Sequence, residues 1–447
     1  MRNLTTIRRA VRTFTILAGV TTPFITAVAS DQIPAPPQNR PIAITNTTIH
    51  PVNGAVVENG TIVFVGGRIT AIGTEVTVPE GAEIISAAGK HVYPGLISAD
   101  TYIGLTEIGA VRATVDRSET GTINPNVRAE RAVNPESELI PVARANGITL
   151  MVTSPSGGLI AGMSAMMMMD GWTYEDMTFK APAALYVEWP SMRITPSPPG
   201  KKSEDEQKKE REKTIQRITD AFLDARAYMV AKKAETARGI PYHEVDSRWD
   251  AMIPVLQRTV PVVVRASELR QIEAAVAWAE QLNLRLIIAH GDDAWMVADL
   301  LKAAQVPVLV GGTHRLPGRR FDAYDDPFTL PAKLFRAGVP FAITSNDEAP
   351  HERNLPYQAA TAAAYGLPRD EALKAITLYP AQIFGVAERV GSLETGKDAT
   401  LIVTTGDPLD IRSEVEMEFI QGRRIDLSTR HTTLYEKYRE KYRRIKP

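Results

Sequence analysis

The chain contains no cysteine and carries almost no net charge. Its 447 residues include 51 Lys and Arg against 52 Asp and Glu, a formal net charge of −1. The absence of cysteine excludes disulfides, thiolate zinc sites and a cysteine nucleophile. The balanced charge argues against nucleic-acid binding, which needs a concentrated basic face. Hydrophobic residues make up 44% of the chain, which is enough for a large buried core.

Long hydrophobic runs are also missing, except near the N-terminus. Four arginines come first there, and an uncharged, mostly apolar stretch follows from Phe14 to Ala29. This pattern is typical of a cleaved secretory signal, and the stretch is shorter than the roughly 20 residues of a membrane span. We expect removal of residues 1–29, which changes the formal charge from −1 to −5. The mature protein is then expected in the periplasm or cell envelope, without an integral membrane span.

Two β-rich segments lie near the two ends of the mature chain, after a Pro- and Gln-rich linker at residues 30–41. Residues 42–93 contain short apolar runs separated by turn dipeptides, among them Asn59-Gly60 and Gly66-Gly67. Such spacing favours hairpins. A similar pattern returns at residues 392–426. Because each segment is too short to bury a core alone, we predict one small β-sandwich domain formed from both.

Between these segments, short β-branched runs alternate with amphipathic helical patterns. The expected strands are Pro261–Val264, Leu286–Ala289, Val306–Val310 and Val339–Thr344. Such alternation is typical of βα units in a parallel sheet. An open nucleotide-binding sheet would need a phosphate loop, and the glycine-rich stretch at residues 156–162 lacks the required spacing. We predict an α/β fold with a (β/α)8 TIM-type barrel over residues 94–391.

Two helical additions stand apart from the barrel pattern. A dense mixed-charge run at residues 201–213 opens a helical insertion at about residues 196–235, which we interpret as a solvated helix. Residues 427–447 form a basic, Tyr-containing helical tail, interpreted as a surface appendage. A run of four methionines at residues 166–169 is expected to pack in the core rather than to bind a soft metal.

Polar residues follow several of the expected barrel strands, where the active sites of such barrels lie. These residues are Asp100, Tyr102, Arg265, His290, Asn346 and Asp347. His314 and His351 fall in later loops, where binding residues are common, although loop histidines are more often merely exposed. With Tyr102, they are the candidate substrate-binding residues.

The segment Tyr93-Pro94-Gly95-Leu96-Ile97-Ser98-Ala99-Asp100-Thr101-Tyr102-Ile103-Gly104 resembles the PGLIDxHxHxG motif of the amidohydrolase superfamily. This family of metal-dependent hydrolases includes the imidazolonepropionases. Its C-terminal signature is similar to four segments of this chain, at residues 354–357, 365–368, 371–377 and 391–399. The resemblance covers about residues 42–426, with breaks across the charged insertion. It implies a barrel beside a small two-ended β domain, and hydrolysis of C–N bonds in cyclic amides or dipeptide-like substrates.

The resemblance also shows where this chain departs from the family's metal-ligand motif. Asp100 and Tyr102 stand where the family has two metal-binding histidines, and Arg265 or Ser267 stands at the fifth-strand histidine. His290 matches the sixth-strand histidine. Asp can ligate a divalent ion and neutral Tyr rarely does, while Arg has no lone pair to offer. The expectation is a weakened site, with one divalent metal such as zinc on Asp100 and His290, or no metal.

The catalytic residues implied by the resemblance are equally altered. Asn346 aligns with the family's proton-shuttling aspartate and has no titratable group, while Asp347 follows it. Asp347 could replace it only if the backbone turned its side chain inward, because strand neighbours point to opposite faces. Arg265 is the third candidate. As an alternative to a metal, Arg265 pairs with Asp100 and fills the old cavity with a salt bridge, because a buried charge needs a partner.

Two functional hypotheses remain open on these residues. The first is an exported hydrolase that acts on C–N bonds of a small-molecule substrate with an atypical metal centre. The second is a non-catalytic barrel that binds a ligand or a partner in the envelope. Self-association, or association with a metal-competent paralogue, is compatible with both.

Overall fold

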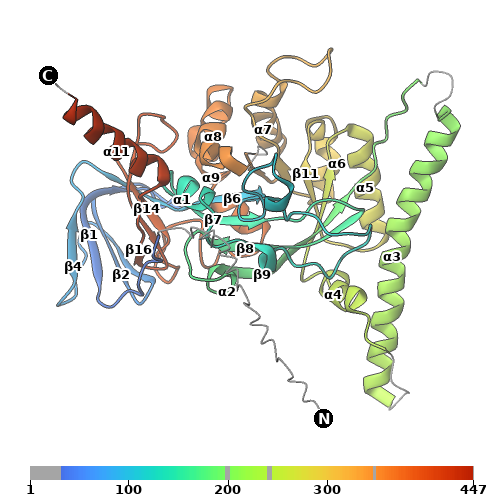
Figure 1. Ribbon diagram of the computed structural model, residues 1–447, viewed down its shortest axis with the longest axis horizontal. Helices are drawn as coiled ribbons and strands as arrows, with labels where there is room; N and C mark the ends of the chain where they lie inside the picture. Colours follow the sequence, from blue (N-terminus) through green and yellow to red (C-terminus); the bar gives the residue numbers. More distant parts are fainter. Residues whose placement is uncertain (1–31, 197–201, 239–243, 346–348, 446–447) are drawn as a thin grey trace, which may run out of the picture. The chain divides into compact units, whose positions relative to one another are not determined.

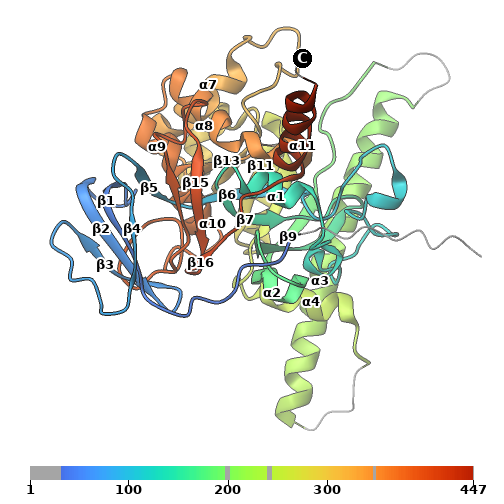
Figure 2. The same cartoon turned by 60° about the vertical axis from the view of Figure 1, so that its left-hand side comes forward.

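The structure is a computed structural model that describes residues 32–196, 202–238, 244–345 and 349–445. The expected signal segment and the candidate residues Asn346 and Asp347 lie outside the described residues. Two eight-stranded sheets organise the described part of the chain (Figures 1 and 2). None of its helices combines the length and the hydrophobicity needed to cross a bilayer.

The first sheet joins strands from residues 42–94 with strands from residues 401–424. Its strands are β1 (Ile42–Ile49), β2 (Val57–Val65), β3 (Arg68–Gly73), β4 (Glu83–Ser86), β5 (His91–Pro94), β14 (Leu401–Thr404), β15 (Val415–Ile420) and β16 (Arg423–Arg424). Their order is β16-β15-β14-β5-β1-β2-β3, with β4 paired to β1. Antiparallel pairing of β14 with β5 brings the two segments together, and Figure 2 shows the red strands beside the blue ones. The small β domain therefore has the two-ended construction expected from the sequence.

Of the two turns predicted in this sheet, one is present and the other is not. Gly66 and Gly67 have φ angles of 57° and 80°, and they connect β2 to β3. The turn expected at Asn59-Gly60 is wrong, because both residues lie inside β2. Asn59 has a φ of 47°, and the pairing of β1 with β2 is irregular around Thr47 and Gly60. An extra residue absorbed as a bulge, rather than a chain reversal, accounts for the turn-like sequence.

The second sheet is the barrel. Its strands are β6 (Leu96–Thr101), β7 (Ile148–Thr153), β8 (Ile160–Met168), β9 (Thr178–Glu188), β10 (Val262–Ala266), β11 (Leu286–His290), β12 (Val308–Val310) and β13 (Phe341–Ile343), in sequence order across the sheet. The pairs from β9 to β13 are parallel, as is β6 with β7. The expected α/β barrel is confirmed. One strand departs from the all-parallel pattern, because β8 runs antiparallel to both β7 and β9.

The local sequence explains the reversed strand. Gly157 and Gly158 have φ angles of 88° and 69°, which lets the short connection turn β7 back into β8. Every residue of β8 is buried, and Met166 and Met167 are fully so. The methionine run is therefore core packing, as the sequence suggested.

The barrel closes through a short non-strand segment. β6 and β13 are the edge strands of the sheet. Ile97 of β6 donates its backbone N–H to the Ile376 carbonyl at 2.8 Å, and Ile343 of β13 donates to the Ala375 carbonyl at 3.0 Å. Residues 375–376 thus bridge the gap, so that the first and last strands end close together.

Helices alternate with strands over the second half of the barrel. The helices are α5 (Leu269–Gln281), α6 (Ala298–Ala303), α7 (Asp326–Ala337), α8 (Leu355–Ala364), α9 (Arg369–Lys374) and α10 (Leu378–Ile383). A capping box between Glu268 and Gln271 begins α5. The buried residues of α5, which include Ile272, Val276 and Ala279, follow the spacing of a single helix face. Figure 1 shows these helices in yellow to orange.

The remaining α-helices lie between the earlier barrel strands, in the charged insertion and near the C-terminus. They are α1 (Leu139–Arg144), α2 (Tyr174–Met177), α3 (Glu204–Arg238), α4 (Ser247–Leu256) and α11 (Arg430–Arg444). The charged run of the insertion is part of α3 itself, which is 35 residues long. α3 contacts the barrel layer through Phe222, whose ring meets that of Trp278 edge-on at 5.0 Å.

Candidate active site

The carboxyl ends of the barrel strands bring together polar residues that are far apart in the sequence. Asp100 lies on β6, Glu188 ends β9, Arg265 lies on β10 and His290 ends β11. Parallel register sets Arg265 beside Glu188 on one side, and Ala266 beside His290 on the other. The strands are held by a β-branched run, Val262 to Val264, that is fully buried. These side chains therefore occupy the end of the barrel that carries active sites in this fold.

Arg265 is the centre of this cluster. Its guanidinium contacts Glu188 Oε1 at 2.6 Å and Asp100 Oδ1 at 3.6 Å, and the Arg265 side chain is only 8% exposed. It also donates to Ser154 Oγ and to the Pro155 carbonyl, both at 3.0 Å. Burial alone would lower the pKa of Arg265, but the charge of Asp100 and of Glu188 outweighs it and raises that pKa. Arg265 is a permanent buried cation, and the ion pair with Asp100 expected from the sequence is present.

The Asp100 carboxylate is crowded with donors. Ser154 Oγ donates to Oδ1 at 2.5 Å, and the Tyr186 hydroxyl donates to the same oxygen at 3.2 Å. The Tyr186 ring lies 4.6 Å from the Arg265 guanidinium carbon. Burial, followed by the charge of Asp100, raises the pKa of Tyr186 well above its ordinary value, so this phenol stays protonated. Asp100 Oδ1 therefore accepts hydrogen bonds from Ser154 and Tyr186 and also forms the ion pair with Arg265.

Tyr102 lies beside the cluster rather than within its ion pairs. Its ring centroid is 4.8 Å from the Arg117 guanidinium carbon and 5.7 Å from that of Arg265, within cation–π range. Burial is the main cause that raises the pKa of Tyr102. A neutral phenol placed against two cations is suited to contact a ligand, and it makes a poor metal ligand.

His290 has an unusual backbone and an uncharged ring. Its φ angle is 74°, in the left-handed region that a non-glycine residue rarely adopts, and Gly291 follows with a φ of 59°. Burial is the main cause that lowers the pKa of His290; Asp100 opposes the shift and Arg265 reinforces it. The imidazole is therefore neutral at pH 7 and able to accept a proton. Backbone strain of this kind is concentrated at functional positions.

The other predicted residues are more scattered. His314 is exposed and its Nε2 lies 2.8 Å from Thr361 Oγ1. His351 is exposed on the 3-10 helix η4 (Ala349–Asn354). The role of both histidines in binding a substrate stays a prediction, as does the catalytic role of Asn346 and Asp347.

A buried glutamate that the sequence did not single out closes the barrel beneath the site. Glu352 accepts from Ser98 Oγ of β6 at 2.7 Å and from Ser345 Oγ, just after β13, at 3.0 Å. It is almost fully buried, and burial is the main cause that raises its pKa. Because β6 and β13 are the edge strands, Glu352 links the two sides of the seam that carries Asp100.

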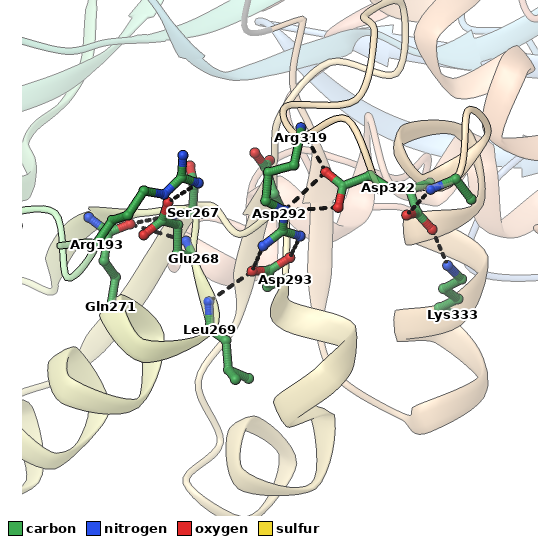
Figure 3. A network of polar contacts seen from close by, with 12 residues as sticks. Arg193, Ser267, Glu268, Leu269, Gln271, Asp292, Asp293, Arg319, Asp322 and Lys333 are labelled. Carbon is green, nitrogen blue, oxygen red and sulfur yellow. Dashed lines mark hydrogen bonds and ion pairs between the residues drawn. The ribbon is translucent and has the colours of Figure 1, made fainter. Parts of the chain in front are cut away.

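A second polar network fixes the loops beside the cluster (Figure 3). Arg319, after β12, makes a two-pronged contact with Asp293, after β11, at 2.5 and 2.8 Å, and it also bonds Asp322 at 2.8 Å. Arg193, after β9, pairs with Glu268, before α5, at 2.6 Å. Because these ion pairs, anchored on the buried Asp293, tie successive loops together, the rim of the barrel is pre-organised.

A groove of about 830 Å³ runs along this network. Its walls include Arg193, Arg270, Arg319, Arg320 and Phe321. Among the described residues, Arg270 and Arg320 form no ion pair, so the groove offers free positive charge beside an exposed aromatic ring. Such a surface is suited to a small molecule that carries a carboxylate.

The described residues do not fit a divalent metal. One oxygen of Asp100 already accepts two hydrogen bonds and pairs with Arg265, Tyr102 is a neutral phenol, and the Arg265 guanidinium is a fixed cation that repels another. Within the described part of the chain, no group of three or more His, Asp and Glu side chains is arranged to hold a metal ion. The positive charge of this site comes from Arg265.

Comparisons with known proteins agree with this architecture. Residues 331–426 match the Amidohydrolase family. A solved amidohydrolase from Thermotoga maritima MSB8 is 28% identical and superposes with a TM-score of 0.76, covering 86% of this chain and 99% of its own. An imidazolonepropionase from Symbiobacterium thermophilum is 25% identical over 386 residues, which is 78% of this chain and 85% of that protein.

A fungal relative is much longer than this chain. The amidohydrolase tasK of Hapsidospora irregularis is 22% identical over 388 residues. The match covers 82% of this chain but only 39% of that protein. Together with the barrel and the small two-ended sheet, these matches make the chain similar to the amidohydrolase superfamily and, within it, to the imidazolonepropionases.

Proposed function

We propose that the chain is an amidohydrolase-type hydrolase of carbon–nitrogen bonds with an atypical centre, in which Arg265 supplies the fixed positive charge. The observation that supports the proposal is the set of partners around the Arg265 guanidinium. Two carboxylates hold it at the carboxyl end of the strands, while its buried Nε–H has no hydrogen-bond partner among the described residues. A buried donor without an acceptor destabilises the fold, and a ligand that accepts this hydrogen bond would remove that cost.

The chemistry follows from the two functional groups that remain available. The Arg265 Nε–H donates to the oxygen of a bound amide, where negative charge develops as water adds to the carbonyl carbon. Neutral His290 takes the proton of that water and returns it to the leaving nitrogen as the C–N bond breaks. The arginines of the neighbouring groove support a substrate with a carboxylate, such as a cyclic amide acid or a dipeptide-like molecule.

Turnover measurements on the purified mature protein test this proposal. We expect slow hydrolysis of at least one substrate from a panel of cyclic amides and dipeptides, unchanged by a chelator. His290→Gln should reduce the rate about 100-fold, the effect of losing a general base. His431→Gln, an exposed histidine on α11, is the matched control and should leave the rate unchanged. Absence of turnover across the panel, or turnover abolished by the chelator, would contradict the proposal.

A second candidate function is a barrel that binds without catalysis. The observation that favours it is that Arg265 pairs with one oxygen of Asp100 and one of Glu188, so that both carboxylates neutralise a cation of the protein itself. The protein would then bind its small molecule unchanged, or act beside a metal-competent paralogue. Saturable binding of a panel compound without product formation, or co-purification of a metal-loaded paralogue from the native envelope, would support this function over hydrolysis.

We also propose export to the periplasm or cell envelope. The support is the arginine-led, apolar segment that ends in Ala27-Val28-Ala29. N-terminal sequencing of the protein from its native cells should find a mature chain that begins at Ser30. A chain that retains residues 1–29 in the soluble cell extract would contradict export.

A further inference from the structure

A pocket of about 740 Å³ opens at the end of the barrel opposite the candidate active site. It lies where β11, β12 and β13 begin, and between the last residues of α5 and α6 and the helix α10. The site described above lies where the strands end. The pocket therefore belongs to neither the Arg265 cluster nor the groove beside it.

The walls of this pocket combine an apolar part with a polar part of nearly equal area. Side chains that begin the three strands or end the flanking helices line it, and these include Val276, Leu286, Val306, Phe341 and Ile383. A volume of this size is typical of a small-molecule site with hydrophobic walls and few polar groups. The apolar part of a ligand can therefore pack against these hydrophobic side chains.

Three cations gather at the same place without an acidic partner. Arg285 lines the pocket and donates to the Ile383 carbonyl at 2.7 Å, while Lys180 donates to the adjacent Phe384 carbonyl at 2.6 Å. Arg258 also lines the pocket and donates to the Asn283 side chain. Within the ranges that the structure describes, none of the three forms an ion pair. Glu280 lies on the pocket wall and is exposed, but it is not within ion-pair distance of them.

The mutual effect of these cations shows that their charge is uncompensated. Burial is the main cause that lowers the pKa of Lys180, and the charge of Arg285 lowers it further. Burial likewise lowers the pKa of Arg285, and Arg258 adds to this effect. Like charges held together at a half-buried site raise the free energy of the protein, and a bound anion would remove this cost.

We propose that this pocket binds an organic anion with an apolar body, such as an alkyl or aryl carboxylate. The carboxylate lies between the Arg285 and Arg258 guanidinium groups, which offer several N–H donors in planar geometry. The hydrocarbon part covers the apolar wall formed by the starts of the strands. Because the pocket is at the far end of the barrel, this binding is independent of the proposed hydrolysis.

Isothermal titration of the full mature chain with decanoate tests the proposal, with decanol and decylammonium as uncharged and cationic probes of the same chain length. We expect decanoate to bind one site per chain and to bind at least about tenfold more tightly than either other probe. Arg285→Gln should weaken decanoate binding by about tenfold or more, and the double variant with Arg258→Gln should weaken it further. Arg430→Gln, an exposed arginine on α11, is the matched control and should bind as wild type does.

A steric variant separates this site from general fatty-anion binding. Ala304 lines the pocket and is only half-buried, so Ala304→Trp fills the opening without a change in the core. It should abolish decanoate binding while the far-ultraviolet circular dichroism stays unchanged. Equal binding of decanoate by wild type and by both the Ala304→Trp and the double arginine variants would overturn the proposal, as would a failure of decanoate to bind wild type.

Discussion

At the carboxyl end of the barrel strands, Arg265 lies between Asp100 and Glu188, whereas at the amino end Arg285 and Lys180 donate only to backbone carbonyl oxygens. Both ends hold cationic side chains, nearly buried at the first end and half-exposed at the second. The first is neutralised by carboxylates from β6 and β9, while the second has no acidic partner among the described residues. Compensation by carboxylates makes the first cluster part of what holds the barrel together.

The contrast also distinguishes two functional roles of a cationic side chain in this protein. A cation already paired within the protein acts as a fixed charge, and only the donor that remains free is available to a ligand. The charge of a cation without an acidic partner is neutralised only when an anion binds. We therefore expect substitutions at the carboxyl end to change stability most, and substitutions at the amino end to change ligand affinity most.

The largest effect is expected from removing the paired cation. Arg265→Met leaves Asp100 without its cation and removes the partner of Glu188, and breaking a buried pair from one side costs about 3–5 kcal/mol. Urea denaturation of wild type and variant measures the loss. Adding Asp100→Asn and Glu188→Gln to Arg265→Met should restore more than half of it, because no unpaired charge then remains. A loss below about 1 kcal/mol in the single variant would mean that the pairs contribute little.

A smaller loss is expected at the barrel seam. Glu352→Ala removes the acceptor of Ser98 and Ser345 and leaves two buried hydroxyls without it, a cost of about 2 kcal/mol. Glu352→Gln keeps an acceptor oxygen and should lose less than half as much. Equal stability of the alanine variant and wild type would show that residues 375–376 close the barrel without help.

At the amino end the change in stability should be smaller still. Arg285→Met removes a half-exposed cation that bonds one carbonyl and is repelled by Arg258, so the free energy of unfolding should change by no more than about 1 kcal/mol. Thermal unfolding with decanoate distinguishes the two ends. The anion should raise the melting temperature of wild type and of Arg265→Met, but not that of Arg285→Met. If Arg285→Met lost as much free energy of unfolding as Arg265→Met, the proposed difference between the two ends of the barrel would be wrong.

The smallest expected effect is a change in pH dependence at His290. Its pKa in the folded protein is below the ordinary value of 6.5, so between these two values the unfolded chain binds the proton and the folded chain does not. The contribution of neutral His290 to stability is therefore present above about pH 6.5 and is lost as the pH falls through the folded pKa. Unfolding free energies of wild type and His290→Asn from pH 5 to 8 should show a shallower slope for the variant below pH 6.5. Parallel curves would show that the pKa of His290 is the same in the folded and unfolded states, and would contradict this prediction.

Much of the fold could be predicted from local sequence. Hairpin glycines such as Gly66 and Gly67, and β-branched runs such as Val262 to Val264, act through near neighbours, and so they specify turns and strands directly. The reversed direction of β8 is less accessible, because fully buried parallel and antiparallel strands share the same continuous apolar pattern. Asn59-Gly60 has the composition of a turn, yet pairing with β1 absorbs it as a bulge.

The site was only partly predictable. Asp100, Arg265 and His290 could be placed at strand ends by spacing, and the pairing of Arg265 with Asp100 followed from the need to neutralise a buried charge. Glu188 and Glu352 could not be found in this way, because β9 was not among the expected strands and Glu352 lies on the 3-10 helix η4. Their partners are 77 and 254 residues distant in the chain. Only the register of β9 with β10, and the approach of β13 to β6, bring them into place.

The zinc content of the purified mature protein, measured by mass spectrometry after dialysis, tests the central claim most directly. If Arg265 supplies the charge of this site, wild type holds no stoichiometric zinc. The variant with histidine substitutions Asp100→His, Tyr102→His and Arg265→His should then bind about one zinc per chain, because it restores imidazole ligands beside His290. One tightly held zinc per wild-type chain, lost in His290→Gln, would contradict the account.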